Sequence, residues 1–278
     1  MADAYFTSTT HDKFIPEIWG KEVQIAREEK LIMAPRVERF DVEFSGGGDI
    51  LHIPKITNLS AGNISTTDGT LDASVNTEGE VTLTVDKWKG VAINVLDIVA
   101  AQSRYDLMKF YTQKMGYALA LAVDDDLMAL YDNLSTNTVG TYNTDITDAT
   151  LRSAVQKLDE ANAPMEERFM VIKPAQKNAL LGIDKFVRYD ALGSASTGIR
   201  KGDLGELYGV TTFVSTNVVK ATNDTKNLMW QKSAFGLAMV KDVKVEEFAR
   251  TAFTKRIGAS ELYGVAELRD DHACQVRS

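Results

Sequence analysis

The chain has 278 residues, of which 44% are hydrophobic and 25% charged, enough for one large domain or two linked ones. A net charge of −8, with Lys and Arg spread among acidic residues, argues against specific nucleic-acid binding, which usually needs a basic stripe. The sequence also lacks a signal-peptide pattern, a run of the ~20 apolar residues that span a membrane, and a second cysteine to pair with Cys274.

The first 40 residues predict an arm. Residues 1–12 have the composition of a disordered segment, and Pro16 can occupy the first position of a short amphipathic helix that ends before Pro35. No apolar run directly after this helix could form a core with it. We therefore expect the helix to pack on the main body of the protein or on a neighbouring molecule.

Two strand-like arms, near residues 49–57 and 79–95, predict a β-ribbon. The second arm alternates apolar and polar residues with the period of two that is typical of a strand with one buried face. Residues 58–78 between the arms are rich in Ser, Thr, Asn and Gly and cannot bury a core of their own. Arms of about 15 residues could reach ~50 Å. The ribbon therefore either projects from its domain or folds back into the domain's own sheet.

A long helix is predicted to follow the ribbon. Asp97 is a suitable N-cap, and apolar residues from Tyr105 to Leu130 recur at steps of three and four. At 1.5 Å per residue, roughly thirty residues would extend ~50 Å, which is enough to span a domain. The polar stretch 132–143 is expected to end the helix.

The remainder mixes helices and strands. We predict a helix capped by Thr147 or Asp148, a second helix from Pro174 to Gly182 and a flexible loop over 193–205. Short strands are predicted at 169–172, 207–214, 227–230, 237–240, 243–248, 262–268 and, as a possible last strand, 273–276. Because the order shows no regular βαβ repetition, the fold class is α+β.

No pattern in the chain predicts catalysis, a cofactor or a metal. The glycine-rich stretch 193–198 is followed by Ile199 and Arg200 in place of the Lys-Ser/Thr of a phosphate loop. Residues 124–126 are all Asp, but neighbouring positions on a helix point about 100° apart and do not converge on one ion. We interpret this triplet as a solvated or partner-facing patch, in which Asp126 could pair with a basic residue of a neighbouring subunit.

Histidine, cysteine and tryptophan give no clearer signal. The three histidines lie far apart in the sequence, without the short spacing of zinc sites. Cys274 and His272 could form a thiolate pair, although a cysteine of a C-terminal strand is the favoured interpretation. The tryptophans, one in each structural region, are expected to be packing residues: Trp19, Trp88 and Trp230.

The order of three segments, followed by the long helix, resembles the major capsid proteins of tailed bacteriophages, the Hong Kong 97-type fold. The segments read GGDILHIP at 47–54, LTVDKWK at 83–89, and Asp97 with QSRYD at 102–106. The resemblance implies four regions: an N-terminal arm at 1–40, an extended loop at 41–95, a peripheral domain with a spine helix at 96–146 and 240–278, and an axial domain at 147–239.

The resemblance also implies a function without a catalytic site. The chain would assemble as hexamers and pentamers into an icosahedral head around double-stranded DNA, contacted non-specifically. Assembly would occur in the host cytoplasm, with separate scaffolding, portal and possible decoration proteins and no membrane. We expect subunit contacts at eight side chains: Trp19, Lys55, Asp68, Lys87, Trp88, Asp126, Arg200 and Lys201.

Two other functions remain open from the sequence. An encapsulin-like compartment has the same fold and holds a cargo enzyme in place of a genome. A soluble oligomeric enzyme could instead use the ribbon as a dimerisation arm, but it would need a pocket of converging titratable groups.

Overall fold

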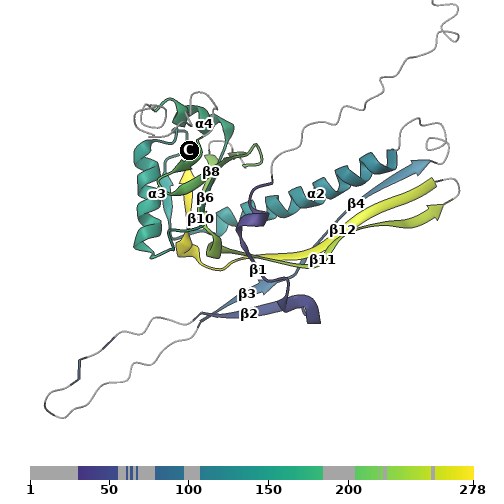
Figure 1. Cartoon of the computed structure of the whole chain (residues 1–278), viewed down its shortest axis with the longest axis horizontal. Coiled ribbons are helices and arrows are strands. Elements are labelled where there is room, and N and C mark those ends of the chain that lie inside the picture. Colours follow the sequence, from purple (N-terminus) through teal and green to yellow (C-terminus); the bar gives the residue numbers. More distant parts are fainter. Residues whose placement is uncertain are drawn as a thin grey trace, which may run out of the picture.

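The computed structural model describes residues 31–55, 61, 63, 64, 67, 79–96, 107–183, 204–218, 220, 221, 224–251 and 254–278. It has a compact part and an elongated part, with a thin two-stranded ribbon below their junction (Figure 1). The predicted α+β class is confirmed. The N-terminal helix expected between Pro16 and Pro35 lies almost wholly outside the described residues, and a 3-10 turn at Ala34–Arg36 includes Pro35.

The compact part is built on a seven-stranded mixed sheet. Its main path follows the order β5 (Thr138–Gly140), β13 (Ala273–Arg277), β10 (Asp224–Gln231), β6 (Arg168–Ile172), β8 (Val210–Val214) and β7 (Glu206–Leu207). A short strand, β9 (Lys220–Ala221), pairs with β10. Alternate residues of the central strand β6 face opposite cores, because Met170 and Ile172 belong to one cluster while Phe169 and Val171 pack in another.

Two helices, α3 (Asp148–Glu160) and α4 (Pro174–Leu181), contribute to the cluster that contains Met170 and Ile172. The Thr147 side chain caps α3 by accepting from the backbone N–H of Thr150, and Leu151, Ala154 and Leu158 form its buried stripe. Pro174 opens α4, where its missing N–H costs nothing. The positions predicted for both helices are confirmed.

The elongated part combines a long helix with a four-stranded sheet. The sheet order is β1 (Glu38–Arg39), β11 (Phe235–Thr251), β12 (Thr254–Glu267) and β4 (Lys87–Leu96). Helix α2 (Leu107–Ala129) lies along β4 and β12 (Figure 1), and Met115 and Leu119 pack on Ile257 and Ala259. The predicted long helix is confirmed, although its expected cap, Asp97, lies outside the described residues.

The ribbon consists of β2 (Ile50–Lys55) and β3 (Gly79–Thr84), paired antiparallel along six residues each. Only its base is buried, where Leu51 and Leu83 pack with Phe44 and Ala238. Gly264 of β12 permits this close approach, because a Cβ atom there would lie 2.3 Å from the Thr84 carbonyl oxygen.

The structure corrects the predicted extent of the ribbon. Residues 79–95 are not one arm, since the chain leaves β2 after Thr84 and pairs with β12 from Lys87 onward. An isolated two-stranded ribbon is marginal in water, whereas β4 gains both a ladder with β12 and packing of Val91 and Ile93 beneath α2. The described strands of the ribbon therefore extend only about 20 Å, and not ~50 Å.

Two other predictions need correction. The strand expected at 207–214 is a hairpin, with positive φ at Tyr208 and Gly209 in the two-residue turn between β7 and β8. The strands expected at 237–240 and 243–248 are one strand, β11, with irregular register. The final strand β13 pairs with β10, which was expected in the axial domain, and with β5, which was expected in the peripheral domain. The four predicted domain boundaries remain predictions.

One core joins the two sheets. It contains Trp230 from β10, Phe235 from β11, Tyr263 from β12 and Leu127 from α2, all fully buried. The segment Ile32–Ala34 enters the same core, and the buried Asp124 carboxylate on α2 accepts its three backbone N–H groups at 2.7–3.1 Å. Asp124 is 0% exposed, which corrects its assignment to a solvated patch.

Replacement of Asp124 should weaken the folded state. We expect Asp124→Asn to lose about 2–3 kcal/mol of unfolding free energy, because an amide turns one acceptor into a donor facing a buried N–H group. Urea unfolding measures the difference. The neighbouring Asp125 is exposed, so Asp125→Asn should change stability by less than about 0.5 kcal/mol. Equal stability of the two variants would contradict this role of Asp124.

Candidate functional site

The eight predicted contact residues divide into two groups. Lys55, Lys87, Trp88 and Asp126 lie in the described part of the chain. The other four lie outside it: Trp19, Asp68, Arg200 and Lys201. The glycine-rich stretch 193–198 is also outside the described residues.

Lys87 and Asp126 meet within one subunit. The Asp126 carboxylate on α2 accepts a 2.6 Å hydrogen bond from the Tyr263 hydroxyl. The same carboxylate lies 3.5 Å from the Lys89 amine and 3.7 Å from the Lys87 amine, both on β4. The structure therefore gives Asp126 partners in its own chain, and this ionic cluster holds α2 against the sheet.

Glu261 lies opposite Lys89 in the ladder between β12 and β4 and belongs to the same region. It is 1% exposed, and its Oε1 atom has no hydrogen-bond partner among the residues that the structure describes. Burial, and then the nearby Asp126 charge, raise the pKa of the Glu261 carboxyl. Burial and the hydrogen bond to Asp126 likewise raise the pKa of Tyr263, so its hydroxyl keeps the proton that it donates.

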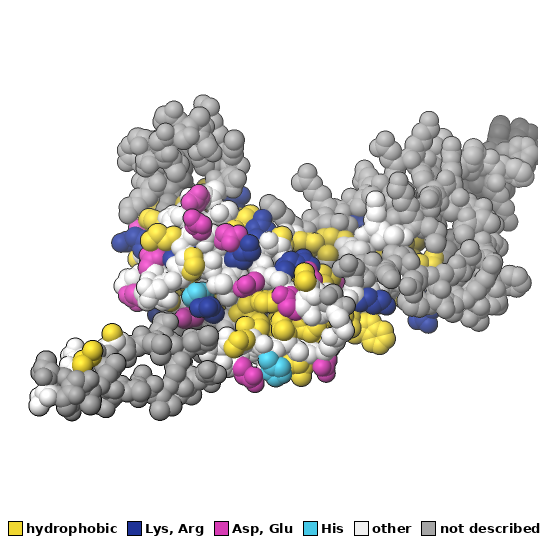
Figure 2. All heavy atoms as spheres, turned by 60° about the horizontal axis from the view of Figure 1, so that its bottom comes forward, with side chains coloured by type: hydrophobic (Ala, Val, Ile, Leu, Met, Phe, Trp, Pro, Cys, Tyr) yellow, Lys and Arg dark blue, Asp and Glu magenta, His cyan; other side chains and the backbone are white. Residues whose placement is uncertain are grey.

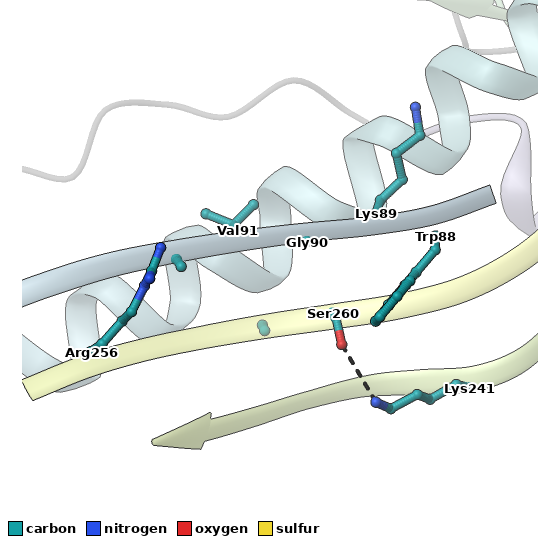
Figure 3. Close-up of a pocket in the computed structure, with 9 residues that line it drawn as sticks. Trp88, Lys89, Gly90, Val91, Lys241, Arg256 and Ser260 are labelled. Carbon is teal, nitrogen blue, oxygen red and sulfur yellow. Dashed lines mark hydrogen bonds between the residues drawn. The ribbon is translucent and has the colours of Figure 1, made fainter. Parts of the chain in front are cut away.

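Trp88 lies on the opposite face of the same sheet and is 75% exposed. This corrects its expected role as a packing residue, which Trp230 alone fulfils among the described tryptophans. Trp88 borders a hollow of about 530 Å³. The lining includes Gly90 and Ala92 of β4, Ser260 and Arg256 of β12, and Lys241 of β11. Figure 3 shows Trp88, Ser260 and Lys241 together, with Val91 and Lys89 directed toward the helix.

Exposed apolar residues also occur around the ribbon. Val42, just before the ribbon, is 80% exposed, and Ile50 at the start of β2 is also exposed. Figure 2 views the molecule from the side that lies below the sheet in Figure 1, and hydrophobic side chains gather in the middle of this face. Charged side chains of both signs surround them. Such a mixture is typical of a surface that contacts other proteins.

A second, more polar hollow lies where the two sheets join. It is lined by residues from the end of α3, from β1 and from the two 3-10 turns that flank β11 and β12, including Ser233, Arg269, Asp271 and His272. The Ser233 hydroxyl donates to Gln231 Oε1 at 2.5 Å and lies 2.8 Å from His272 Nδ1. Because the single hydroxyl proton goes to Gln231, His272 must donate its Nδ1–H to Ser233.

Among the described residues, neither hollow presents an activated nucleophile, because in the second one the Ser233 proton goes to Gln231 and not to His272. No group of three or more His, Cys, Asp or Glu side chains in the described part could hold a metal ion. Cys274 lies in the C-terminal strand β13, as the favoured interpretation predicted. It is buried there, and burial raises its pKa to about 12. A thiol with so high a pKa is a poor nucleophile. Among the described helices, none is sufficiently long and apolar to cross a membrane.

Sequence reasoning missed the residues around Trp88. Lys241 and Arg256 stand 15 positions apart on two strands, and irregular register in β11 decides which side chains share a face. The alternation of Val91, Ile93 and Val95 predicted only a strand with one apolar face. The partner strand that completes the surface could not be read from that alternation.

The fold matches subunits of assembled phage shells. A chain of Mycobacterium phage Che8 superimposes with a TM-score of 0.80 at 23% identity, covering 95% of this chain and 97% of that one. A capsid chain of Cyanophage P-SCSP1u gives 0.79 at 19% identity over 95% and 93%. A capsid chain of a native GTA particle gives 0.76 at 10% identity over 99% of each chain. No curated protein matches the sequence. The fold is thus that of the Hong Kong 97-type capsid proteins.

A sequence model described as phage capsid protein matches residues 78–269. The match covers more than half of the chain, and the chain belongs to this family. Its predicted function as a phage capsid protein and its place in the virion are confirmed. The role is structural and not enzymatic. The family match therefore contradicts the alternative of a soluble oligomeric enzyme.

The buried His272 should make stability depend on pH. Burial lowers the His272 pKa below its ordinary 6.5. The unfolded chain therefore takes up this proton first as pH falls through about 6.5, and the folded state loses stability below that pH. We expect His272→Asn, whose amide can still donate to Ser233, to lose fewer degrees of Tm than the wild type between pH 7.5 and 5.

The control for this thermal-denaturation series is His52→Asn. His52 is exposed on β2 beside Glu80, so its replacement should leave the pH dependence unchanged. A wild-type pH dependence in His272→Asn would contradict the assignment of this effect to His272.

Proposed function

We propose that the chain is the major capsid protein of a tailed phage, which assembles as hexamers and pentamers into an icosahedral head around double-stranded DNA. A capsid protein acts through homo-oligomeric capsomers. The observation that supports assembly into such a head is the ribbon, of which only the base is buried within the subunit. Beyond it, Ile53 and Val81 stay only half-buried on the face that Leu51 and Leu83 begin. A strand pair with so little core of its own is stabilised when a neighbour covers it.

Three segments would make the contacts between subunits. The N-terminal arm (5–36) and the ribbon (44–84) would lie across neighbours, and the loop 188–205 would meet its copies at the capsomer axis. The proposed contacts include Lys55 at the outer end of β2 and, in segments known only from sequence, Trp19, Asp68, Arg200 and Lys201. Each contact can be weak, because many of them act together in a closed shell.

The spine helix would give the subunit its stiffness. It is held on one face by the apolar cluster of Met115 and Leu119 and by the ionic cluster of Asp126, and at one end by Asp124. These contacts tie α2 to both sheets and to the base of the arm. A subunit connected in this way can carry load between the capsomer axis and its periphery.

Other partners follow from the same proposal. A shell of this kind requires a portal, a scaffolding activity from another protein and, in some cases, decoration proteins. Packaged DNA would be touched without sequence specificity, in keeping with the net charge of −8. The phage capsid family match favours a genome-enclosing shell over an encapsulin-like compartment with enzyme cargo.

Shortening the ribbon should block assembly without unfolding the subunit. Deletion of 58–78 leaves a two-residue connection between β2 and β3, a length that hairpins tolerate. We expect circular dichroism and Tm close to those of the wild type, but no closed shells by electron microscopy.

A matched control keeps the length and composition of 58–78 but scrambles their order. We expect it to fold and to assemble poorly as well, because a contact with a neighbour depends on order as well as on length. Normal-sized shells from the deletion variant would contradict the proposed role of the ribbon.

A further inference from the structure

A buried carboxyl group lies beneath α2, in the joint between this helix and the four-stranded sheet. Glu261 of β12 is 1% exposed, and the two residues that flank it on the same strand face both contact the helix. Ala259 packs with Leu119, and the Tyr263 hydroxyl donates to Asp126. Because β12 and β4 pair in regular register here and side chains alternate along a strand, Glu261 faces the helix as well.

The lysines nearest to Glu261 already pair with another carboxylate. Lys87 and Lys89 of β4 hold their amines 3.7 Å and 3.5 Å from Asp126, and Lys89 is directed toward the helix (Figure 3). Lys89 is also the ladder partner of Glu261, yet no ion pair within 4.0 Å joins the two among the described residues. The Oε1 atom of Glu261 likewise has no hydrogen-bond partner there.

The other described groups around Glu261 supply no cation. Helix α2 has no Asp, Glu, Lys or Arg between Lys114 and the three aspartates 124–126. Side chains of β11 are described as far as Lys241, which lies on the opposite face of the sheet and donates to Ser260. An ionised Glu261 would therefore add a second anion beside Asp126 in a place that water scarcely reaches, at a large desolvation cost.

This environment favours the protonated form of Glu261. Burial, and then the Asp126 charge, raise the Glu261 pKa above its ordinary 4.5. The unfolded chain titrates at the ordinary value, so the stability that this group contributes is fully present below about pH 4.5. It is lost as the pH rises through the raised pKa of the folded state. The effect is opposite in direction to that of His272, which appears on acidification.

The sheet is irregular next to Glu261. In the ladder between β11 and β12, Lys241 pairs with Leu262 and Lys244 pairs with Ser260, so two residues of β11 stand opposite Glu261 alone. A bulge of this kind interrupts the ladder and allows a strand to bend. A small movement of β12 at Glu261 therefore breaks few backbone hydrogen bonds on this side.

We propose that Glu261 is a proton-controlled latch between α2 and the four-stranded sheet. With the proton bound, the neutral carboxyl lets the helix close on β12. When the proton leaves to solvent, the second anion beside Asp126 loosens the C-terminal half of α2 from the sheet. The apolar contacts of Met115 and Leu119 hold the other half of the helix in both states. The latch belongs to the folded subunit and does not depend on shell assembly.

Thermal denaturation of the full-length chain between about pH 5 and pH 8.5 tests the latch. Glu261→Gln keeps nearly the same shape but cannot ionise. We expect the Tm of this variant, relative to that of the wild type, to rise by at least about 2 °C across this range. The difference between the two proteins isolates Glu261, because His272 titrates in both. Light scattering checks that both proteins are in the same assembly state.

Hydrogen exchange locates the effect within the subunit. At pH 8, peptides from 115–129 and 254–263 should exchange at least about threefold faster in the wild type than in Glu261→Gln, whereas peptides from α3 should exchange equally. Comparison of the two proteins at one pH removes the intrinsic dependence of exchange on pH.

Controls separate the latch from a general effect of losing a carboxylate. Glu206→Gln makes the same chemical change at an exposed position on β7 and should leave the pH dependence of Tm unchanged. Should Glu261→Gln fail to fold, Glu261→Leu replaces it, with the same expected trend. In an Asp126→Asn background, Glu261→Gln should alter the pH dependence less, because the neighbouring charge is gone.

The possible outcomes are distinct. A Tm difference that stays constant with pH would overturn the titration of Glu261 in the folded subunit. A Glu261→Gln variant that loses stability relative to the wild type as the pH rises would show an ionised Glu261 paired with Lys89, and would overturn the latch. Equal exchange of the α2 peptides in the two proteins would contradict the joint as the place where the proton acts.

Discussion

The buried carboxylate of Asp124 is the interaction on which the architecture most depends. It accepts three consecutive backbone N–H groups at the base of the N-terminal arm. Those groups have no strand or helix partner of their own and could not otherwise enter the core without a large desolvation cost. Asp124 thereby places the arm, the end of α2 and the junction of the two sheets in one packed unit. The surfaces of the subunit extend in several directions from this unit.

The structure divides its polar groups between those directed inward and those left at the surface. Asp124 and Asp126, two residues apart on α2, are both satisfied within the chain and hold the helix to the sheets. On the opposite face of the same sheet Trp88 is exposed, and Lys241 and Arg256 have no acidic partner among the described residues. A rigid interior with an unsatisfied exterior is the arrangement expected of a subunit that completes its contacts only in an assembly.

Much of the fold could be predicted where local signals are strong. Thr147 with Leu151 and Leu158 marks α3, and the spacing of Met115 and Leu119 marks the spine helix, because capping and a 3.6-residue period act within a few residues. The split between β3 and β4 could not be predicted. Apolar and polar residues alternate on both sides of it, and only the choice between β2 and β12 as partner shows where the ribbon ends.

The candidate contact surface was less predictable for the same reason. Trp88 was predicted as a contact residue, but the hollow beside it depends on β12 pairing with both β4 and β11 in a bulged register. Asp124 looked like its neighbours in the sequence, because nothing local distinguishes a buried carboxylate from two partly exposed ones. Contacts between residues far apart in the sequence determine both the hollow beside Trp88 and the burial of Asp124. Such contacts cannot be predicted from the local pattern of one sequence.

Electron microscopy of the purified full-length protein, alone and co-expressed with a scaffolding protein, tests the central claim most directly. The account predicts closed shells, or rings and tubes of one repeating capsomer, formed by this chain across a concentration and salt series. Small uniform particles in every condition, with and without the scaffold, would contradict it.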